Sequence, residues 1–401
     1  MDAPGQSEGV SRLRLLVGVH EGGFNGIDTY SEQVAASAVA AGHEVTLAAT
    51  TSAASRLRMG LGLAGVRILE LDIAPPGRVA RLAARFWPRL EQRRLERGLA
   101  SALARTGQRF DVVHLNRPGL APAIRPFTRR LVSAAWFYPH EPVRRAVETW
   151  RHTRGGNLLR RMVMTLKSFS HYLGDVEGYR ASDFVVAPTP SLSAQLRSQG
   201  IQAMLCPPPV QVERPHLSPV QERRATDLKR LLICSGDLSH PRKNLLLALE
   251  SLRYLAPRGW RLQLEVIGKN PERLQALART LPEGIDVRFT GPLPAARVQA
   301  HMRSADVFLF PSLYEEWGYA AVEALLCGTP VVTFPVYPFP FMLEGGLGEI
   351  AGDLSARSLA EAVERAFHLN DRPRLARAAA ERFGGSVVAR KLTEIWTAPR
   401  A

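Results

Sequence analysis

The chain has 401 residues, of which 52 are Lys or Arg and 37 are Asp or Glu, so its formal net charge is +15 at pH 7. This length allows two domains with complete hydrophobic cores. No run of about 18 uninterrupted apolar residues predicts a membrane-spanning helix, and no helix-turn-helix, RNP-type or zinc-finger pattern supports a nucleic-acid partner. The positive charge suits phosphorylated substrates or anionic lipid, although solvated arginines also explain it.

The N-terminal segment and the cysteines both bear on the cellular compartment. Residues 1–12 are polar and lack a hydrophobic segment, and we expect a disordered tail rather than a signal peptide. The three cysteines, Cys206, Cys234 and Cys327, are widely spaced, which fits neither a disulfide framework nor a zinc site. These features favour a cytoplasmic protein without a bound metal.

The first elements predict a strand–loop–helix–strand unit. Residues 13–19 and 43–50 are apolar runs typical of buried strands. A glycine-rich loop over residues 20–30 leads into a helix that we expect to stop at Gly42. Glycines let backbone N–H groups approach a ligand closely, and a plain turn is the alternative. The candidate binding residues of this loop are Gly23, Asn25 and Gly26.

Two later strand ends carry polar side chains. After an arginine-rich helical region, residues 110–116 form a strand that ends with His114 and Asn116. Residues 134–142 form a second strand end, which carries His140.

Residues 144–180 interleave basic with apolar side chains. A basic amphipathic helix of this kind can lie on an anionic membrane. The alternative is a stripe packed against the sheet, with its arginines in water. Segment 144–170 is therefore a candidate for peripheral contact with the inner face of a membrane.

The domain boundary is expected after the first 200 residues. Residues 184–191 predict the last strand of a first domain that spans residues 13–205. Consecutive prolines then open a stiff, extended connector, and we expect a linker over residues 206–229. Residues 230–382 form the second domain.

The second domain opens with an apolar strand and a loop over residues 231–244, and further strand-to-loop steps follow at 264–269 and 287–293. Such apolar strands support an open parallel sheet more than any chemistry. The first loop carries Arg242 and Lys243.

Residues 305–333 are the most informative segment. An apolar strand is followed by a loop with Glu315, a helix with Glu323, and a stop at Gly328 with a proline just beyond. The helix N-terminus there suits phosphate, and carboxylates beside it can accept hydrogen bonds from sugar hydroxyls. Taken alone, both glutamates could also be solvated charges.

The sequence P-S-L-Y-E-E-W-G-Y-A-A-V-E-A-L-L-C-G-T-P-V-V at residues 311–332 resembles the glutamate–seven–glutamate signature of retaining GT-B glycosyltransferases of family four. The G-H-E-V at 42–45, the D-V-V-H at 111–114 and the P-R-K-N at 241–244 resemble further elements of that family in the same order. The resemblance implies an α/β fold of the GT-B type: two Rossmann-like, doubly wound domains that face a cleft. It also implies that a C-terminal helix, residues 383–401, crosses back to the first domain.

The resemblance further implies a metal-independent hexosyl- or N-acetylhexosaminyltransferase without a cofactor. Its co-substrate would be a nucleoside-diphosphate sugar, with a UDP-sugar favoured. The acceptor would be a hydroxyl of a small molecule or of a lipid-linked precursor, in secondary-metabolite or bacterial cell-envelope glycan biosynthesis. His114 and Asn116 are possible acceptor contacts.

Site residues follow from the same match. Arg242 and Lys243 would hold the diphosphate, Glu323 the ribose hydroxyls, and Glu315 the transferred sugar. His140 matches a histidine that contacts the donor sugar, so that Glu315 and His140 are the candidate catalytic residues. The complete donor set is Gly236, Arg242, Lys243, Leu293, Glu315, Trp317, Gly318, Tyr319, Ala320 and Glu323.

Three positions depart from the family pattern. Glu316 replaces a glycine, Trp317 replaces a phenylalanine, and Asp237 replaces an arginine. A carboxylate about 5 Å from a phosphate would cost roughly 3 kcal/mol at an effective dielectric near 20. Either Asp237 turns away or Arg242 supplies the missing charge, and we favour the second. A nucleotide-sugar epimerase of the GT-B type and a non-catalytic binding protein on a degenerate scaffold are the alternative functions.

Overall fold

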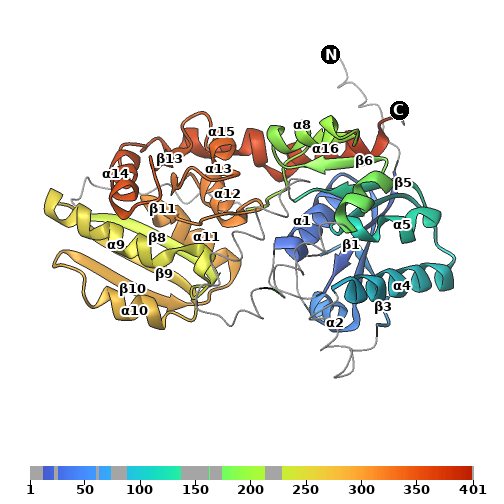
Figure 1. Ribbon diagram of the computed structural model, residues 1–401, viewed down its shortest axis with the longest axis horizontal. Coiled ribbons are helices and arrows are strands. Elements are labelled where there is room, and N and C mark those ends of the chain that lie inside the picture. The colour runs from blue at the N-terminus through green and yellow to red at the C-terminus, as the bar shows by residue number, and fades with distance from the viewer. Residues whose placement is uncertain are drawn as a thin grey trace, which may run out of the picture. The chain divides into compact units, whose positions relative to one another are not determined.

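The computed structural model describes residues 12–21, 26–59, 63–73, 88–136, 162, 174–212 and 228–399. The chain divides into two compact units (Figure 1): unit 1 comprises Met1–Pro209 with Val388–Ala401, and unit 2 comprises Val210–Val387. Each unit contains a parallel sheet with helices, and the predicted α/β, doubly wound class is confirmed. Within the described ranges, no helix is long and apolar enough to cross a membrane.

The sheet of unit 1 has seven parallel strands in the order β3-β2-β1-β4-β5-β6-β7. In chain order the strands are β1 (Arg14–His20), β2 (Glu44–Thr50), β3 (Val66–Leu71), β4 (Phe110–Leu115), β5 (Thr128–Ala134), β6 (Phe184–Ala187) and β7 (Ala203–Leu205). The helices are α1 (Gly26–Ala40), α2 (Thr51–Met59), α4 (Pro88–Thr106), α5 (Ala121–Ile124) and α8 (Pro190–Ser198), with the short helices η1 (Pro118–Leu120) and η2 (Arg125–Phe127). In β1, all residues after the first are buried, as expected for a central parallel strand.

The sheet of unit 2 has six parallel strands in the order β10-β9-β8-β11-β12-β13. The strands are β8 (Leu228–Asp237), β9 (Arg261–Lys269), β10 (Ile285–Gly291), β11 (Val307–Phe310), β12 (Val331–Thr333) and β13 (Gly348–Ile350). The helices are α9 (Leu245–Leu255), α10 (Glu272–Ala278), α11 (Ala295–Ser304), α12 (Tyr319–Leu326), α13 (Phe339–Met342), α14 (Ala356–Ala366) and α15 (Arg372–Phe383), with η3 (Pro241–Lys243) and η4 (Ala256–Arg258).

The strand order of unit 2 reverses between β8 and β11. The chain first builds outward from β8 through β9 to β10, and then returns to add β11, β12 and β13 on the other side. The loops that leave the carboxyl ends of β8 and β11 therefore diverge to opposite faces of the sheet. Such a switch point is where ligands bind in open parallel sheets.

Two apolar clusters form the core of unit 2. One joins the strands to α9 and α14, and α9 lies along β8 and β9 (Figure 1). The other joins β11 to α12, α13 and α15. Helix α12 begins after Gly318, whose φ is +91°, and ends before Gly328, whose φ is +76°. Glycine adopts such left-handed conformations without strain, which explains both ends of this helix.

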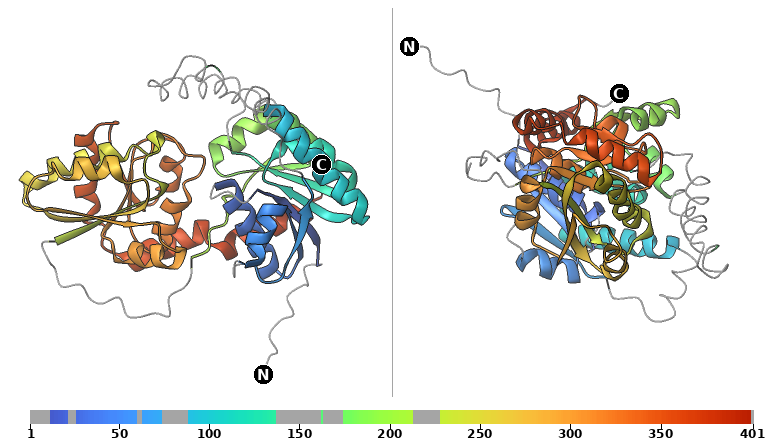
Figure 2. Two further views of the ribbon diagram at one scale, coloured as in Figure 1. Left: turned by 90° about the horizontal axis from the view of Figure 1, so that it is seen from below. Right: turned by 90° about the vertical axis from the view of Figure 1, so that its left-hand side faces the viewer.

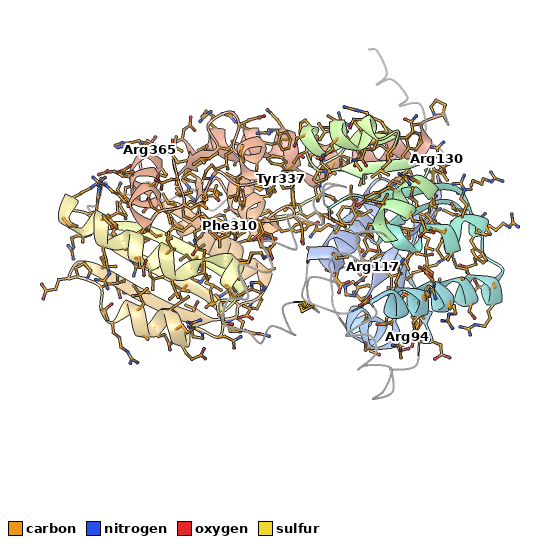
Figure 3. All side chains as sticks on the ribbon, in the orientation of Figure 1. Arg94, Arg117, Arg130, Phe310, Tyr337 and Arg365 are labelled. Atoms are coloured by element: carbon orange, nitrogen blue, oxygen red, sulfur yellow. The ribbon has the colours of Figure 1, made fainter. Side chains whose placement is uncertain are left out.

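The C-terminal helix α16 (Gly385–Thr397) begins two residues later than expected, because Gly384 is extended and separates it from α15. Its residues from Val388 onward belong to unit 1 (Figure 2). The Trp396 indole N–H donates to Nδ1 of His114 at 3.0 Å. Arg130, labelled in Figure 3, donates to the carbonyl groups of Ile395 and Trp396.

We predict that Trp396→Ala destabilises unit 1 by about 3–5 kcal/mol. The indole is 2% exposed, so its removal leaves a cavity and an unpaired nitrogen on His114. Urea unfolding followed by circular dichroism would measure the loss. The matched control is Thr397→Ala, an exposed position on the same helix, which should change stability by about 0.5 kcal/mol or less. Equal stabilities of the two variants would contradict the anchoring role of Trp396.

Candidate functional site

The candidate site is built from the two loops at the switch point of unit 2. The first follows β8 and includes η3, and the second follows β11 and leads into α12. The backbone N–H of Leu313 donates to the carbonyl of Arg242 at 2.9 Å, which joins the loops directly. Residues that are about 70 positions apart in the sequence thus share one edge of the sheet.

One carboxylate binds both cations of the first loop. Oε2 of Glu315 lies 2.7 Å from Nη1 of Arg242, and Oε1 lies 2.6 Å from Nζ of Lys243. The Glu315 side chain is only 7% exposed. Arg242 also faces the ring of Tyr314 at 5.2 Å, and Lys243 lies 4.9 Å from the ring centre of Phe310, which is labelled in Figure 3. The expected neighbours Arg242, Lys243 and Glu315 are therefore brought together.

The Asp237 carboxylate is hydrogen-bonded within its own loop and to Asn270, which follows β9. This carboxylate accepts hydrogen bonds from the backbone N–H and hydroxyl of Ser239, at 2.9 and 2.7 Å, and from the Asn270 amide at 3.1 Å. These hydrogen bonds lower the pKa of Asp237. Arg242 is committed to Glu315, so that the geometry supports the alternative in which Asp237 turns away.

Glu323 lies on α12, and its carboxylate makes no hydrogen bond or ion pair with any of the described residues. Burial raises the pKa of Glu323 to about 7. Burial also raises the pKa of the Cys234 thiol to about 12, with a further rise from Glu323 and an opposing effect of Lys243. Cys234 therefore lies within electrostatic reach of both Glu323 and Lys243.

Three buried polar atoms in the segment 312–319 lack a hydrogen-bond partner: the hydroxyls of Ser312 and Tyr319 and the indole N–H of Trp317. Tyr319 precedes Glu323 by one helical turn, and burial, with a contribution from Glu323, raises its pKa. Buried polar groups are normally paired. The unpaired Tyr319 hydroxyl, one turn from Glu323 on α12, indicates a place for a polar ligand.

The Trp317 side chain lies in the core rather than in the site. It is 1% exposed, and its ring meets that of Phe383 edge-on at 5.6 Å. Only its backbone is left to contact a donor, because the indole fills the apolar cluster beneath α12. Sequence alone gave no sign of this, since an aromatic residue beside a glycine suits either a ligand or a core.

The glycines and small residues of the predicted donor set differ in role. A Cβ on Gly318 would lie 3.3 Å from the rings of both Phe310 and Phe339, so a glycine fits this turn best. At Gly236 a Cβ would meet nothing within 4 Å, which leaves open space beside the first loop. Leu293 and Ala320 are half-buried and pack against the second core cluster.

In unit 1, His114 and Asn116 have structural partners. His114 is fully buried, its Nδ1 accepts from Trp396, and its Nε2 lies 2.7 Å from the Tyr30 hydroxyl. Because an indole N–H can only donate, Nδ1 is unprotonated, and burial lowers the pKa of His114 to about 3. The Asn116 amide is bound to the backbone of Val19. This burial does not fit the expectation that the two side chains contact an acceptor.

Gly26 is the first residue of α1 and is exposed. Near it lies a titratable cluster that the sequence did not single out. His20, at the end of β1, pairs with Glu32 at 2.7 Å, and the buried carboxylate of Asp28 accepts from the backbone N–H of Glu21 at 3.2 Å. The residue types are visible in the sequence, but their pairing depends on how α1 packs on β1.

Several predicted positions lie outside the described residues: Gly23, Asn25, His140 and, apart from Met162, the basic segment 144–170. Across the ranges that are described, no group of three or more His, Cys, Asp or Glu side chains is arranged to hold a metal ion.

Two family models match the chain. The one described as Glycosyltransferase Family 4 matches residues 24–214, and the one described as Glycosyl transferases group 1 matches residues 220–383. Together they include both loops of the candidate site and most of unit 1.

Similar proteins include glycosyltransferases of two kinds. A 2-deoxystreptamine glucosyltransferase from Streptomyces kanamyceticus is 36% identical over 115 residues, which are 28% of this chain and 28% of that protein. A phosphatidyl-myo-inositol mannosyltransferase from Mycobacterium leprae (strain TN) is 33% identical over 212 residues, 50% of this chain and 55% of that protein. The chain thus spans about half the length, or less, of these curated relatives.

Among solved structures, the sucrose-phosphate synthase from Thermosynechococcus elongatus superposes with a TM-score of 0.67. The sequences are 17% identical, and the match covers 96% of this chain and 97% of that one. At this identity the likeness concerns the fold, and the predicted GT-B architecture is confirmed.

We predict that Glu323→Gln changes how stability depends on pH. The pKa of Glu323 is about 7 in the folded chain, against the usual 4.5. The unfolded chain therefore loses this proton first, and the free energy of unfolding should fall by about 3 kcal/mol between pH 4.5 and 7. The Gln variant should lack this fall and be the more stable protein at pH 8.

Urea unfolding at pH 4.5, 6 and 8 would test this expectation. The control is Glu283→Gln, which removes an exposed carboxylate of the same unit and should follow the parent protein. If the free energy of unfolding depends on pH in the same way in Glu323→Gln and in the parent protein, burial does not raise the pKa of Glu323.

Proposed function

The chain belongs to the group 1 glycosyltransferases, with a family 4 N-terminal region, and from this premise we propose that it transfers a sugar from a nucleoside-diphosphate sugar to a hydroxyl of an acceptor. A UDP-sugar is the favoured donor. The observation that carries the proposal is that one switch point holds both the cations Arg242 and Lys243 and the carboxylate of Glu323, which makes no ion pair with the described residues. A nucleoside diphosphate presents the complementary groups, namely phosphate anions and a ribose diol.

Each part of the donor has a counterpart in unit 2. Arg242 and Lys243 would bind the diphosphate by charge-assisted hydrogen bonds, supported by the N–H groups at the start of α12. Glu323 would accept hydrogen bonds from the ribose hydroxyls, and the unpaired hydroxyl of Tyr319 lies one turn away on the same helix. Glu315 would contact the transferred sugar.

The proposed reaction retains the configuration at the anomeric carbon and requires no metal. The bond from the anomeric carbon to the diphosphate oxygen breaks while the acceptor hydroxyl oxygen bonds to that carbon on the same face. The departing phosphate oxygen takes the hydroxyl proton, so no dedicated base is required. Lys243 and Arg242 would stabilise the negative charge that develops on the leaving group.

Both a small molecule and a lipid-linked glycan precursor are candidate acceptors. The name of one relative contains a small molecule, 2-deoxystreptamine, and the name of the other contains a lipid, phosphatidyl-myo-inositol. A lipid-linked acceptor would place the protein at the cytoplasmic face of the membrane, with the basic segment 144–170 as the proposed contact.

A thermal-shift screen of UDP-, GDP- and ADP-sugars, followed by transfer assays with both acceptor types, would test the proposal. The assays would be run with and without anionic liposomes. We expect one donor to stabilise the protein and to be consumed only when an acceptor is present, with loss of transfer in Glu323→Ala. Conversion of the donor alone would indicate an epimerase. The proposal would be overturned if no nucleotide sugar bound.

We predict that Lys243→Ala and Arg242→Ala each raise the KM for the donor about tenfold or more, because each removes a charged hydrogen bond to phosphate worth about 1.5–3 kcal/mol. Initial rates at varied donor concentration would measure the effect. Arg273→Ala removes an exposed charge on α10 and should leave the KM unchanged. Unaltered kinetics in both site variants would exclude the assigned phosphate contacts.

A further inference from the structure

The cation pair of the candidate site is occupied by a group of the protein itself. Each oxygen of the Glu315 carboxylate is held by a different charged donor, at 2.7 Å from Arg242 and 2.6 Å from Lys243. A phosphate group could bridge the two cations in the same way, with one oxygen on each. The pair is mostly shielded, since the three side chains are 7–21% exposed.

We propose that Glu315 is an internal counter-ion: it occupies the two cations until the donor diphosphate replaces it, and this exchange frees the carboxylate to bind the transferred sugar. The inference rests on the proposed function, because it assigns the diphosphate to Arg242 and Lys243.

Electrostatics make the two anions competitors. With Glu315 ionised, the three side chains carry a net charge of +1, which attracts a diphosphate much less than the +2 of the cations alone. A carboxylate that stayed beside the bound phosphate would repel it. Stable binding of the diphosphate therefore favours departure of Glu315 from the cations.

The cations keep other contacts when Glu315 leaves. Nη1 of Arg242 also donates to the carbonyl of Tyr314 at 3.3 Å, and its guanidinium faces the Tyr314 ring. The Lys243 ammonium faces the ring of Phe310. The exchange thus needs movement of one carboxylate, while the phosphate-binding groups stay in place.

A consequence is that the site recognises diphosphate before it recognises sugar. A ligand without phosphate cannot displace Glu315 from the cations, so the carboxylate is not available to it. Glu315 is then a positioning residue for the phosphate step as well as a contact for the sugar.

Calorimetric titration of the full chain with UDP, pyrophosphate and uridine would test the proposal in Glu315→Gln. Removing the competing charge should tighten binding of UDP and pyrophosphate about tenfold and leave uridine binding unchanged. The same variant should lose transfer activity at least tenfold, because the sugar contact is lost. The matched control is Glu316→Gln, which removes the neighbouring charge and should tighten UDP binding by less than about threefold.

The outcomes separate the inference from the proposed function. If the parent protein binds UDP and Glu315→Gln binds it equally or more weakly, the counter-ion role is wrong while the donor site stands. If the parent protein binds no nucleoside diphosphate, the proposed function itself fails. If Glu315→Gln does not fold, Glu315→Ala takes its place: it also removes the charge that competes for both cations, and UDP should again bind more tightly than in the parent.

Discussion

The bidentate contact between Glu315 and the cations Arg242 and Lys243 is the interaction on which the candidate site depends. It joins a loop that follows β8 to a loop that follows β11, and these strands are neighbours only because the sheet order reverses between them. The carboxylate offsets the repulsion between the two adjacent cations, which Tyr314 and Phe310 also hold in place. The carboxylate therefore sets the geometry that an incoming diphosphate would meet.

The architecture could be predicted from the sequence because its signals are local. Apolar runs ended by glycine or proline predicted the parallel strands, and the helix stop at Gly328 corresponds to a left-handed residue in the structure. The ends of elements that depend on tertiary contacts differed from the sequence-based prediction. Strand β8 begins at Leu228 because its first residues pair with β9. Helix α16 begins at Gly385 because Gly384 is extended.

The same division applies to the candidate site. The family resemblance implied that Arg242, Lys243 and Glu315 share one site, and the switch-point topology brings their loops to one edge. The resemblance could not reveal long-range partners. Asp237 is bound by Asn270 on a neighbouring strand end, and His114 is bound by Trp396, 282 positions away. Such partner choices depend on packing between distant segments and leave no local pattern in the sequence.

The most direct test of this account is a crystal structure of the full chain with UDP bound. The account predicts the diphosphate on Arg242 and Lys243, the ribose hydroxyls at Glu323, and the Glu315 carboxylate displaced from both cations. A structure in which UDP binds elsewhere, or in which it binds here while both ion pairs of Glu315 remain intact, would contradict it.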